Sequence, residues 1–171
     1  MKRFLIYSVI LISTVFASFS CIDLDEEYEE NLREQEKYYA KLQEQFGKDT
    51  VIIEKYLADS SLTAVKDSSG IYYIIEAAGE ELHPNDNSVI TVLYKGCLVD
   101  GTVFSQTYDD VAYTTNLRGL ISGWRIGIPK IGAGGKIKLF VPSYYGYGDV
   151  EWGSVPANSV LIFDIELLSF Y

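Results

Sequence analysis

Few side chains in this sequence could carry acid–base, nucleophilic or metal chemistry. The 171 residues include one histidine, His83, and two cysteines, Cys21 and Cys97. The two thiols lack the spacing of a zinc or redox motif, and Cys97 lies in an apolar run that favours a small buried residue. His83 lies in a stretch of Pro, Asn and Asp that is typical of a surface turn. The sequence therefore predicts neither a metal site nor a Ser-His-Asp triad.

Composition narrows the possible partners. The chain has 14 basic and 24 acidic residues, a formal net charge of −10. Phosphate backbones and anionic lipid surfaces both attract basic proteins. The charge therefore argues against nucleic acid and against simple attraction to a membrane. Hydrophobic residues make up 48% of the chain, which is enough for a core.

The N-terminal residues follow the plan of an export signal. Lys2 and Arg3 precede an apolar run over residues 4–19, which is short for a membrane-spanning helix of about 20 residues. Ser20 and Cys21 follow, and this segment resembles a lipobox. We predict a lipoprotein signal peptide over residues 1–20 and a lipid on Cys21. The alternative is an ordinary signal peptide that contains a cysteine.

This plan predicts an exported protein anchored to a bacterial membrane. The acidic stretch over residues 23–30 resembles the tethers of Bacteroidetes surface lipoproteins. We expect an outer-membrane location, with the protein facing the periplasm or the cell surface. Acidic runs are also common in solvated chain.

Residues 21–69 are predicted to form an acidic tether and a helical linker. Apolar residues recur at helical spacing over residues 24–46, and some recur every seven residues. This helix could pack on its own domain, stand as a stalk or form a dimer interface. The protein is therefore expected to be a monomer or a weak dimer. Gly47 is predicted to end the helix, and Asp49 to cap a second one.

Residues 70–171 are predicted to form an α+β domain. Strand-like runs cover residues 71–77, 88–99, 102–104, 136–141 and 160–168. Asp100-Gly101 predicts a hairpin between the second and third runs. Residues 120–128 have helical spacing, although glycines interrupt them. Several strands and one short helix predict an antiparallel sheet packed over a helix.

Six segments of this region, in order, resemble motifs of the FKBP family of peptidyl-prolyl isomerases. They are VLYKGCLVDGTVF at 92–104, LISGW at 120–124, GGK at 134–136, VPSYYGYG at 141–148, VPAN at 155–158 and LIFDIELL at 161–168. The resemblance implies a curved antiparallel sheet wrapped around a short helix, preceded by N-terminal helices.

The resemblance also implies a function: cis–trans isomerisation of X–Pro bonds in exported, proline-containing polypeptides, without cofactor, metal, covalent chemistry or acid–base chemistry. The proline would sit in an apolar pocket with Trp124 as its floor, and Tyr147 would donate a hydrogen bond to the peptide. By motif position, the remaining catalytic and substrate-binding residues are Tyr94, Phe104, Phe163, Ile121, Leu120, Val155, Ser105 and either Tyr113 or Val111.

The sequence departs from the family pattern at one polar position. Ser105 stands where the family usually has an aspartate, and no arginine follows within residues 108–115 to serve as its partner. Activity is therefore expected to be reduced. The alternatives are a binding or chaperone module without catalysis, and a tethered scaffold protein. Trp152 is predicted to overhang the pocket.

Overall fold

The structure is a computed structural model that describes residues 2–108 and 111–171, with side chains described over residues 26–108 and 111–171. The signal-peptide residues and Cys21 lie outside the described side chains. The chain divides into two compact units, Met1–Gln43 and Glu44–Tyr171. Within the part that was described, none of the helices has the length and apolar character needed to cross a membrane.

Helix α1 (Lys2–Asp59) is one continuous helix, so the predicted break at Gly47 and the second helix are wrong. In the second unit, Ile53 and Leu57 of α1 are buried against the sheet. This packing outweighs the cost of about 1 kcal/mol for one glycine in a helix. The globular domain is predicted to begin near Gly70, whereas the compact unit of the structure begins at Glu44.

The sheet is antiparallel, in the strand order β1-β2-β6-β7-β3-β4. The strands are β1 (Val65–Lys66), β2 (Tyr72–Ala77), β3 (Val89–Leu98), β4 (Val103–Gln106), β5 (Tyr113–Asn116), β6 (Gly135–Val141) and β7 (Leu161–Phe170). The five predicted strands are confirmed, while β1 and β5 were not predicted. Strand β5 pairs with the first half of β3, and β4 pairs with its second half.

The predicted hairpin between β3 and β4 is also confirmed. Gly101 has φ 89°, a conformation that glycine adopts without steric cost. Its N–H donates to the Leu98 carbonyl at 3.0 Å. Asp100 accepts from the Thr102 N–H at 2.8 Å. The turn sets the register that brings β4 beside the end of β3.

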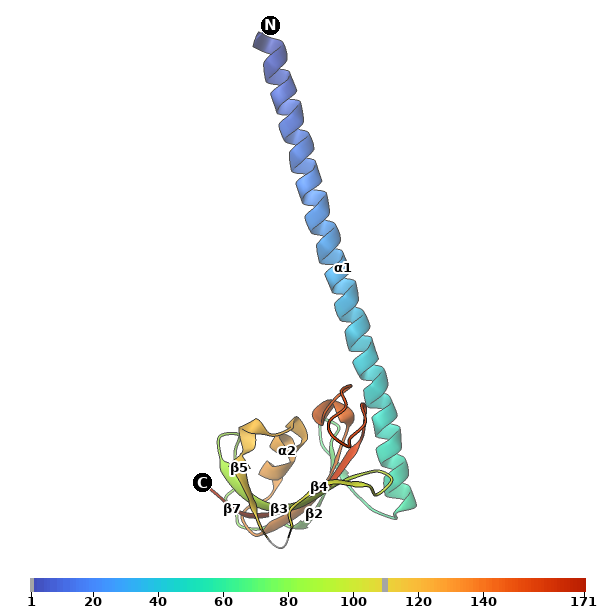
Figure 1. The fold of residues 1–171 in the computed structure, drawn as a ribbon, viewed down its shortest axis with the longest axis vertical. Helices are drawn as coiled ribbons and strands as arrows, with labels where there is room; N and C mark the ends of the chain where they lie inside the picture. The colour runs from blue at the N-terminus through green and yellow to red at the C-terminus, as the bar shows by residue number, and fades with distance from the viewer. Residues whose placement is uncertain (1, 109–110) are drawn as a thin grey trace. The chain divides into compact units, whose positions relative to one another are not determined.

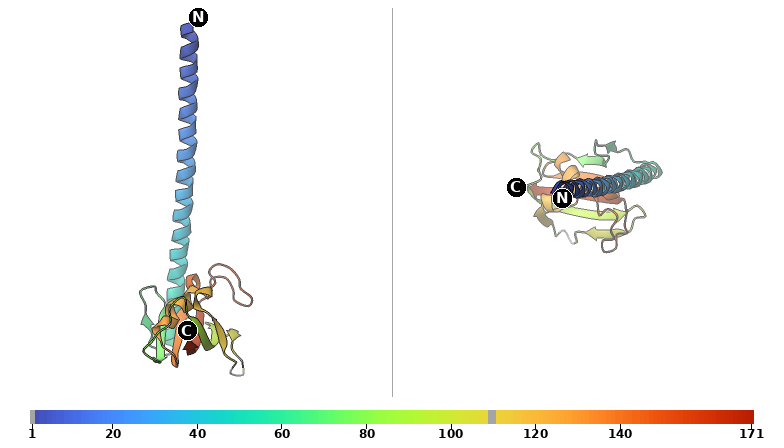
Figure 2. Two further views of the ribbon diagram at one scale, coloured as in Figure 1. Left: turned by 90° about the vertical axis from the view of Figure 1, so that its left-hand side faces the viewer. Right: turned by 90° about the horizontal axis from the view of Figure 1, so that it is seen from above.

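Helix α2 (Ser122–Gly127) lies against the inner face of the curved sheet, between the 3₁₀ turns η1 (Leu117–Gly119) and η2 (Ile128–Lys130) (Figures 1 and 2). Its glycines allow this approach. A Cβ at Gly123 would lie 2.5 Å from Val141, and one at Gly127 would lie 2.5 Å from Leu139. The glycines that interrupt the predicted helix therefore permit close packing on β6.

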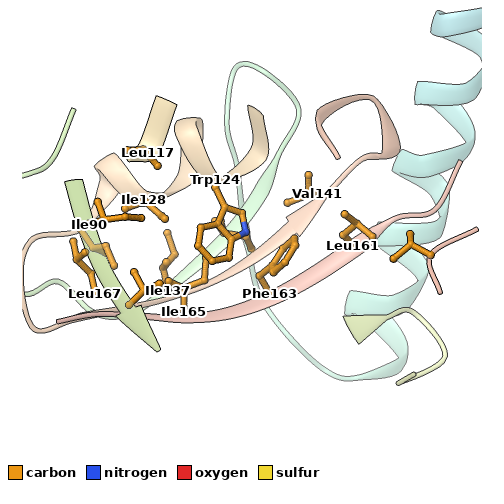
Figure 3. Packing of buried hydrophobic residues seen from close by; sticks show 14 residues of the cluster. Ile90, Leu117, Trp124, Ile128, Ile137, Val141, Leu161, Phe163, Ile165 and Leu167 are labelled. Carbon is orange, nitrogen blue, oxygen red and sulfur yellow. The ribbon is translucent and has the colours of Figure 1, made fainter. Parts of the chain in front are cut away.

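Two hydrophobic clusters lie on opposite faces of the sheet. The inner cluster includes Trp124 of α2 and the alternating residues Phe163, Ile165 and Leu167 of β7 (Figure 3). The outer cluster places Phe140 and its neighbours against α1. Alternation along each strand separates the two sets. The sheet is thus covered by a helix on each face, and α2 carries the residue predicted as the pocket floor.

Candidate functional site

An open pocket of about 170 Å³ lies between α2 and the aromatic residues of the sheet. A cavity of about 150 Å³ holds a benzene-sized ring, so this space suits a proline ring. Nine side chains line the pocket: Tyr94, Phe104, Ser105, Tyr113, Leu120, Ile121, Trp124, Tyr147 and Phe163.

Trp124 is held at the base of the pocket by edge-to-face aromatic contacts. Its ring centroid lies 5.1 Å from that of Tyr94 and 5.4 Å from that of Phe163, with the planes nearly perpendicular. The indole points from α2 toward β7 in Figure 3, and only 4% of the residue is exposed. Such pairs add about 0.5–1.5 kcal/mol each beyond area burial. These contacts fix the orientation of the indole at the base of the pocket.

Gly96 makes room for the aromatic rings above the sheet. It pairs with Phe163 of β7 and with Ser105 of β4. A Cβ at this position would lie 2.8 Å from the Phe104 ring and 2.9 Å from the Phe163 ring. Those rings pack edge to face at 5.6 Å. A glycine at this point of β3 is what allows the pocket wall to form.

A bulge in β4 turns two consecutive residues toward the pocket. The register shifts between the Gly96–Ser105 and Cys97–Val103 pairs, which leaves Phe104 without a partner in the ladder. Bulges interrupt the alternation of side chains along a strand. Both Phe104 and Ser105 consequently line the pocket.

The polar edge of the pocket consists of hydroxyl groups. The Tyr94 hydroxyl and Ser105 Oγ form a hydrogen bond of 2.7 Å. Burial, with a smaller contribution from Tyr94, raises the pKa of the Tyr147 phenol. The Tyr147 hydroxyl therefore stays protonated at neutral pH and can donate a hydrogen bond. None of the nine lining residues is a carboxylate, imidazole, thiol or amine.

Tyr147 is flanked on its outer side by Trp152. Their rings stack at 5.6 Å with an angle of 6° between the planes. Trp152 is held by two backbone hydrogen bonds with Val155, both 2.9 Å, and 64% of it is exposed. The indole lies beside Tyr147 at the pocket rim and is absent from the nine-residue lining.

Of the eleven predicted site residues other than Cys21, nine meet in the pocket and two do not. Val155 is 2% exposed and belongs to the inner core. Val111 is 70% exposed. The choice between Val111 and Tyr113 is decided by β5, which pairs Tyr113 with Val92 and brings its ring 6.0 Å from Tyr94. The functional roles of these residues remain predictions.

The second unit of the chain matches a known protein family. Residues 80–168 match the model of the family described as FKBP-type peptidyl-prolyl cis-trans isomerase. The chain is 49% identical over 105 residues to the FKBP-type peptidyl-prolyl cis-trans isomerase FkpA of Buchnera aphidicola subsp. Schizaphis graminum, covering 60% of this chain and 42% of that protein. It is 40% identical over 102 residues to FkpA of Escherichia coli K12, covering 59% and 38%.

The crystal structure of FkpA from Escherichia coli superposes with a TM-score of 0.64 at 32% identity. This superposition covers 85% of this chain and 72% of that one. The chain spans about two-fifths of the length of the curated relatives named above.

Proposed function

Because this chain belongs to the family of FKBP-type peptidyl-prolyl cis-trans isomerases, we propose that its aromatic pocket binds proline residues and accelerates rotation about the X–Pro bond. The observation that carries the proposal is the ring-sized pocket with Trp124 at its base and Tyr94, Phe104 and Phe163 around it. The substrates would be exported, proline-containing polypeptides that need this rotation during folding.

The proposed mechanism requires no acid or base. Rotation of an amide has a barrier of about 20 kcal/mol, because the planar form is stabilised by resonance. The planar amide is more charge-separated than the twisted one, so an apolar pocket raises the free energy of the ground state more than that of the transition state. A difference of about 4 kcal/mol would accelerate rotation roughly a thousandfold. The rings and aliphatic side chains that line the pocket provide the apolar surroundings that this mechanism requires.

Two groups at the rim would orient the substrate. The Tyr147 hydroxyl would donate a hydrogen bond to a carbonyl of the bound peptide, and its raised pKa keeps the proton in place. The backbone at Leu120 and Ile121 would supply main-chain hydrogen bonds. Since the floor and walls already pack against one another, little ordering would be required on binding.

The test is a protease-coupled isomerisation assay on the chain from residue 22 onward. We expect the wild type to accelerate cis-to-trans conversion of an X–Pro peptide, and Tyr147→Phe to lose about tenfold, equivalent to 1.4 kcal/mol. Tyr144→Phe is the matched control, because Tyr144 is 54% exposed and does not line the pocket. Absence of acceleration by the wild type would contradict the proposal. Equal rates for the two variants would contradict the role of Tyr147.

A second candidate is a module that binds proline segments with little or no catalysis. It is favoured by Ser105, whose Oγ is hydrogen-bonded to the Tyr94 hydroxyl where the family usually has a carboxylate. A carboxylate would form a stronger, charge-assisted bond with the same hydroxyl. A neutral serine therefore leaves the rim less polar and Tyr94 less firmly fixed.

The variant Ser105→Asp separates these candidates. If the serine limits catalysis, kcat/KM rises severalfold while affinity for a proline peptide changes little. Ser60→Asp is the control, because Ser60 is exposed and does not line the pocket. Unchanged kcat/KM in Ser105→Asp would contradict the idea that the serine lowers activity.

We also propose that the protein is exported and lipidated on Cys21, as a Bacteroidetes-type lipoprotein of the outer membrane. The support is the order of charged, apolar and small residues before that cysteine. Labelled palmitate should enter the wild type and not Cys21→Ala. Equal labelling of both would contradict lipidation at this residue.

A weak dimer through α1 is proposed from the exposed Tyr28, Leu32 and Tyr39, which lie at helical spacing in the first unit. Such a dimer would also suit a tethered scaffold protein, in which the domain only mediates contacts. Sedimentation velocity over a hundredfold range of concentration tests it. A sedimentation coefficient that stays constant at the monomer value would contradict the dimer.

A further inference from the structure

Asp49 is a buried carboxylate that the proposed reaction does not use. It lies in the C-terminal part of α1 and has no exposed surface. Gln45, one helical turn earlier, donates to its Oδ1 at 2.8 Å. Burying a charge is costly unless it is fully hydrogen-bonded. A carboxylate in this position therefore requires further partners.

Those partners belong to Ser143, 94 residues later in the chain. Both the backbone N–H and the hydroxyl of Ser143 donate to Asp49 Oδ2, at 2.7 and 2.6 Å. Ser143 is itself 2% exposed and begins the 3₁₀ turn η3 (Ser143–Tyr145). In Figure 1, this orange-red turn lies beside the C-terminal part of α1. Charge-assisted bonds of this kind are roughly twice as strong as neutral ones.

Ser143 in turn holds the backbone on both sides of Tyr147. Its carbonyl accepts hydrogen bonds from the N–H groups of Gly146 and Gly148, each at 2.9 Å. Because these glycines are the immediate neighbours of Tyr147, the Ser143 carbonyl fixes where that side chain leaves the backbone. Ser143 thus connects Asp49 on one side to the pocket wall on the other.

A second contact joins the same two segments. The Phe46 ring of α1 packs edge to face on Tyr145 at 6.2 Å, and the Tyr145 hydroxyl donates to the Ser69 carbonyl at 3.1 Å. The segment from Ser143 to Gly148 is therefore held from the α1 side by an aromatic contact and by a buried carboxylate.

From this chain of contacts we propose that Asp49 is a positioning residue for the pocket, acting through Ser143 on Tyr147. The C-terminal part of α1 then serves the isomerase site as well as the outer core. The activity readout of this proposal rests on the proposed function, whereas its structural readout does not. A displacement of about 1 Å at a positioned group can reduce catalysis by up to a hundredfold.

The test compares variants of the full chain below their melting temperatures. In Asp49→Ala the partners of Ser143 are lost, so kcat/KM should fall about tenfold, and amide hydrogen exchange at Gly146 and Gly148 should accelerate at least tenfold. Asp49→Asn should keep kcat/KM and the exchange rates of Gly146 and Gly148 close to their wild-type values. The amide oxygen of the new asparagine can accept both hydrogen bonds from Ser143. Its NH₂ group can donate to Gln45 once the Gln45 amide has flipped so that its oxygen faces the asparagine.

Ile53→Ala is the matched control. Ile53 lies one turn further along α1 and is 1% exposed, and it packs in the outer cluster. This variant lowers the melting temperature, but it should leave kcat/KM and the exchange of Gly146 and Gly148 at the wild-type level. Equal effects of Asp49→Ala and Ile53→Ala, or unchanged exchange at the two glycines in Asp49→Ala, would overturn the proposal.

A milder variant covers the case in which Asp49→Ala does not fold. Ser143→Ala removes the hydroxyl bond and keeps the backbone bond, so exchange at Gly146 and Gly148 should rise severalfold; no rise would overturn the proposal. If the wild-type chain catalyses no isomerisation, the proposed function fails, while the exchange rates still decide the role of Asp49.

Discussion

The ion pair between Asp67 and Lys130 is expected to contribute measurably to the stability of the fold. Lys130 Nζ donates to Asp67 Oδ2 at 2.6 Å, and the Ser69 N–H donates to Oδ1 at 2.6 Å. The two charged side chains are only 22% and 15% exposed. The Lys130 ammonium also lies 4.7 Å from the centroid of the Tyr73 ring. The pair joins the turn before β2 to η2, directly after the helix that carries the pocket floor.

These hydrogen bonds lower the pKa of Asp67 from 3.8 to about 2, with Lys130 the largest cause and Ser69 next. At 1.36 kcal/mol per pKa unit, the interaction stabilises the folded state by about 2 kcal/mol when the carboxylate is ionised. Because the folded-state pKa is depressed, this contribution is complete above the unfolded-state pKa near 4. It is lost as the pH falls through about 2.

The variant Asp67→Asn should therefore lower the free energy of unfolding by about 2 kcal/mol at pH 7. Urea denaturation of wild type and variant at several pH values measures this difference, which should shrink between pH 5 and pH 2. Asp59→Asn is a matched control: the Lys55–Asp59 pair has the same 2.6 Å separation, but its side chains are 72% and 65% exposed. Exposed pairs contribute at most about 1 kcal/mol. A loss in Asp67→Asn that equals the control at pH 7, or that does not change with pH, would show that the ionised pair does not stabilise the fold.

Three further predictions concern the pocket and the outer core. Isomerase kcat/KM should stay constant from about pH 6 to 9, because none of the nine lining side chains is a carboxylate, imidazole, thiol or amine, and burial raises the pKa of the Tyr147 phenol; a bell-shaped profile in the peptide assay would contradict this. Gly96→Ala should weaken proline-peptide affinity severalfold in calorimetry and destabilise the fold by about 1–3 kcal/mol, since its Cβ would lie 2.8 Å from Phe104. Phe140→Ala should cost about 3–5 kcal/mol in urea denaturation, because that ring is fully buried in the outer cluster. The folded fraction of this variant should bind peptide normally, and a parallel loss of affinity would contradict the separation of the two clusters.

Local sequence patterns predicted most of the sheet. Alternation along β7 placed Phe163, Ile165 and Leu167 on one face, and the structure buries them in the inner cluster. The Asp100-Gly101 turn predicted the hairpin, because its conformation is a property of two adjacent residues. The strand β5 was missed, since its short polar sequence becomes a strand only through pairing with β3.

Contacts with distant segments also decide the extent of helix α1. Gly47 and Asp49 are ordinary signals for the end of one helix and the start of the next. In the fold, Asp49 instead accepts hydrogen bonds from Ser143. No local pattern marks a partner 94 residues away, so the helix boundary was predicted wrongly from signals that are correct on average.

Local patterns in the sequence were enough to predict the family, the order of the strands along the chain and the aromatic character of the pocket, because motifs and alternation do not depend on contacts between distant segments. Tertiary structure decided which aromatic residues meet. It placed Tyr113 rather than Val111 at the pocket through the register of β5, buried Val155 in the core, and turned both Phe104 and Ser105 inward through a bulge. It also joined Asp49 to the backbone around Tyr147. These outcomes depend on pairings between distant segments, and the free energy of those pairings exists only once the sheet has formed.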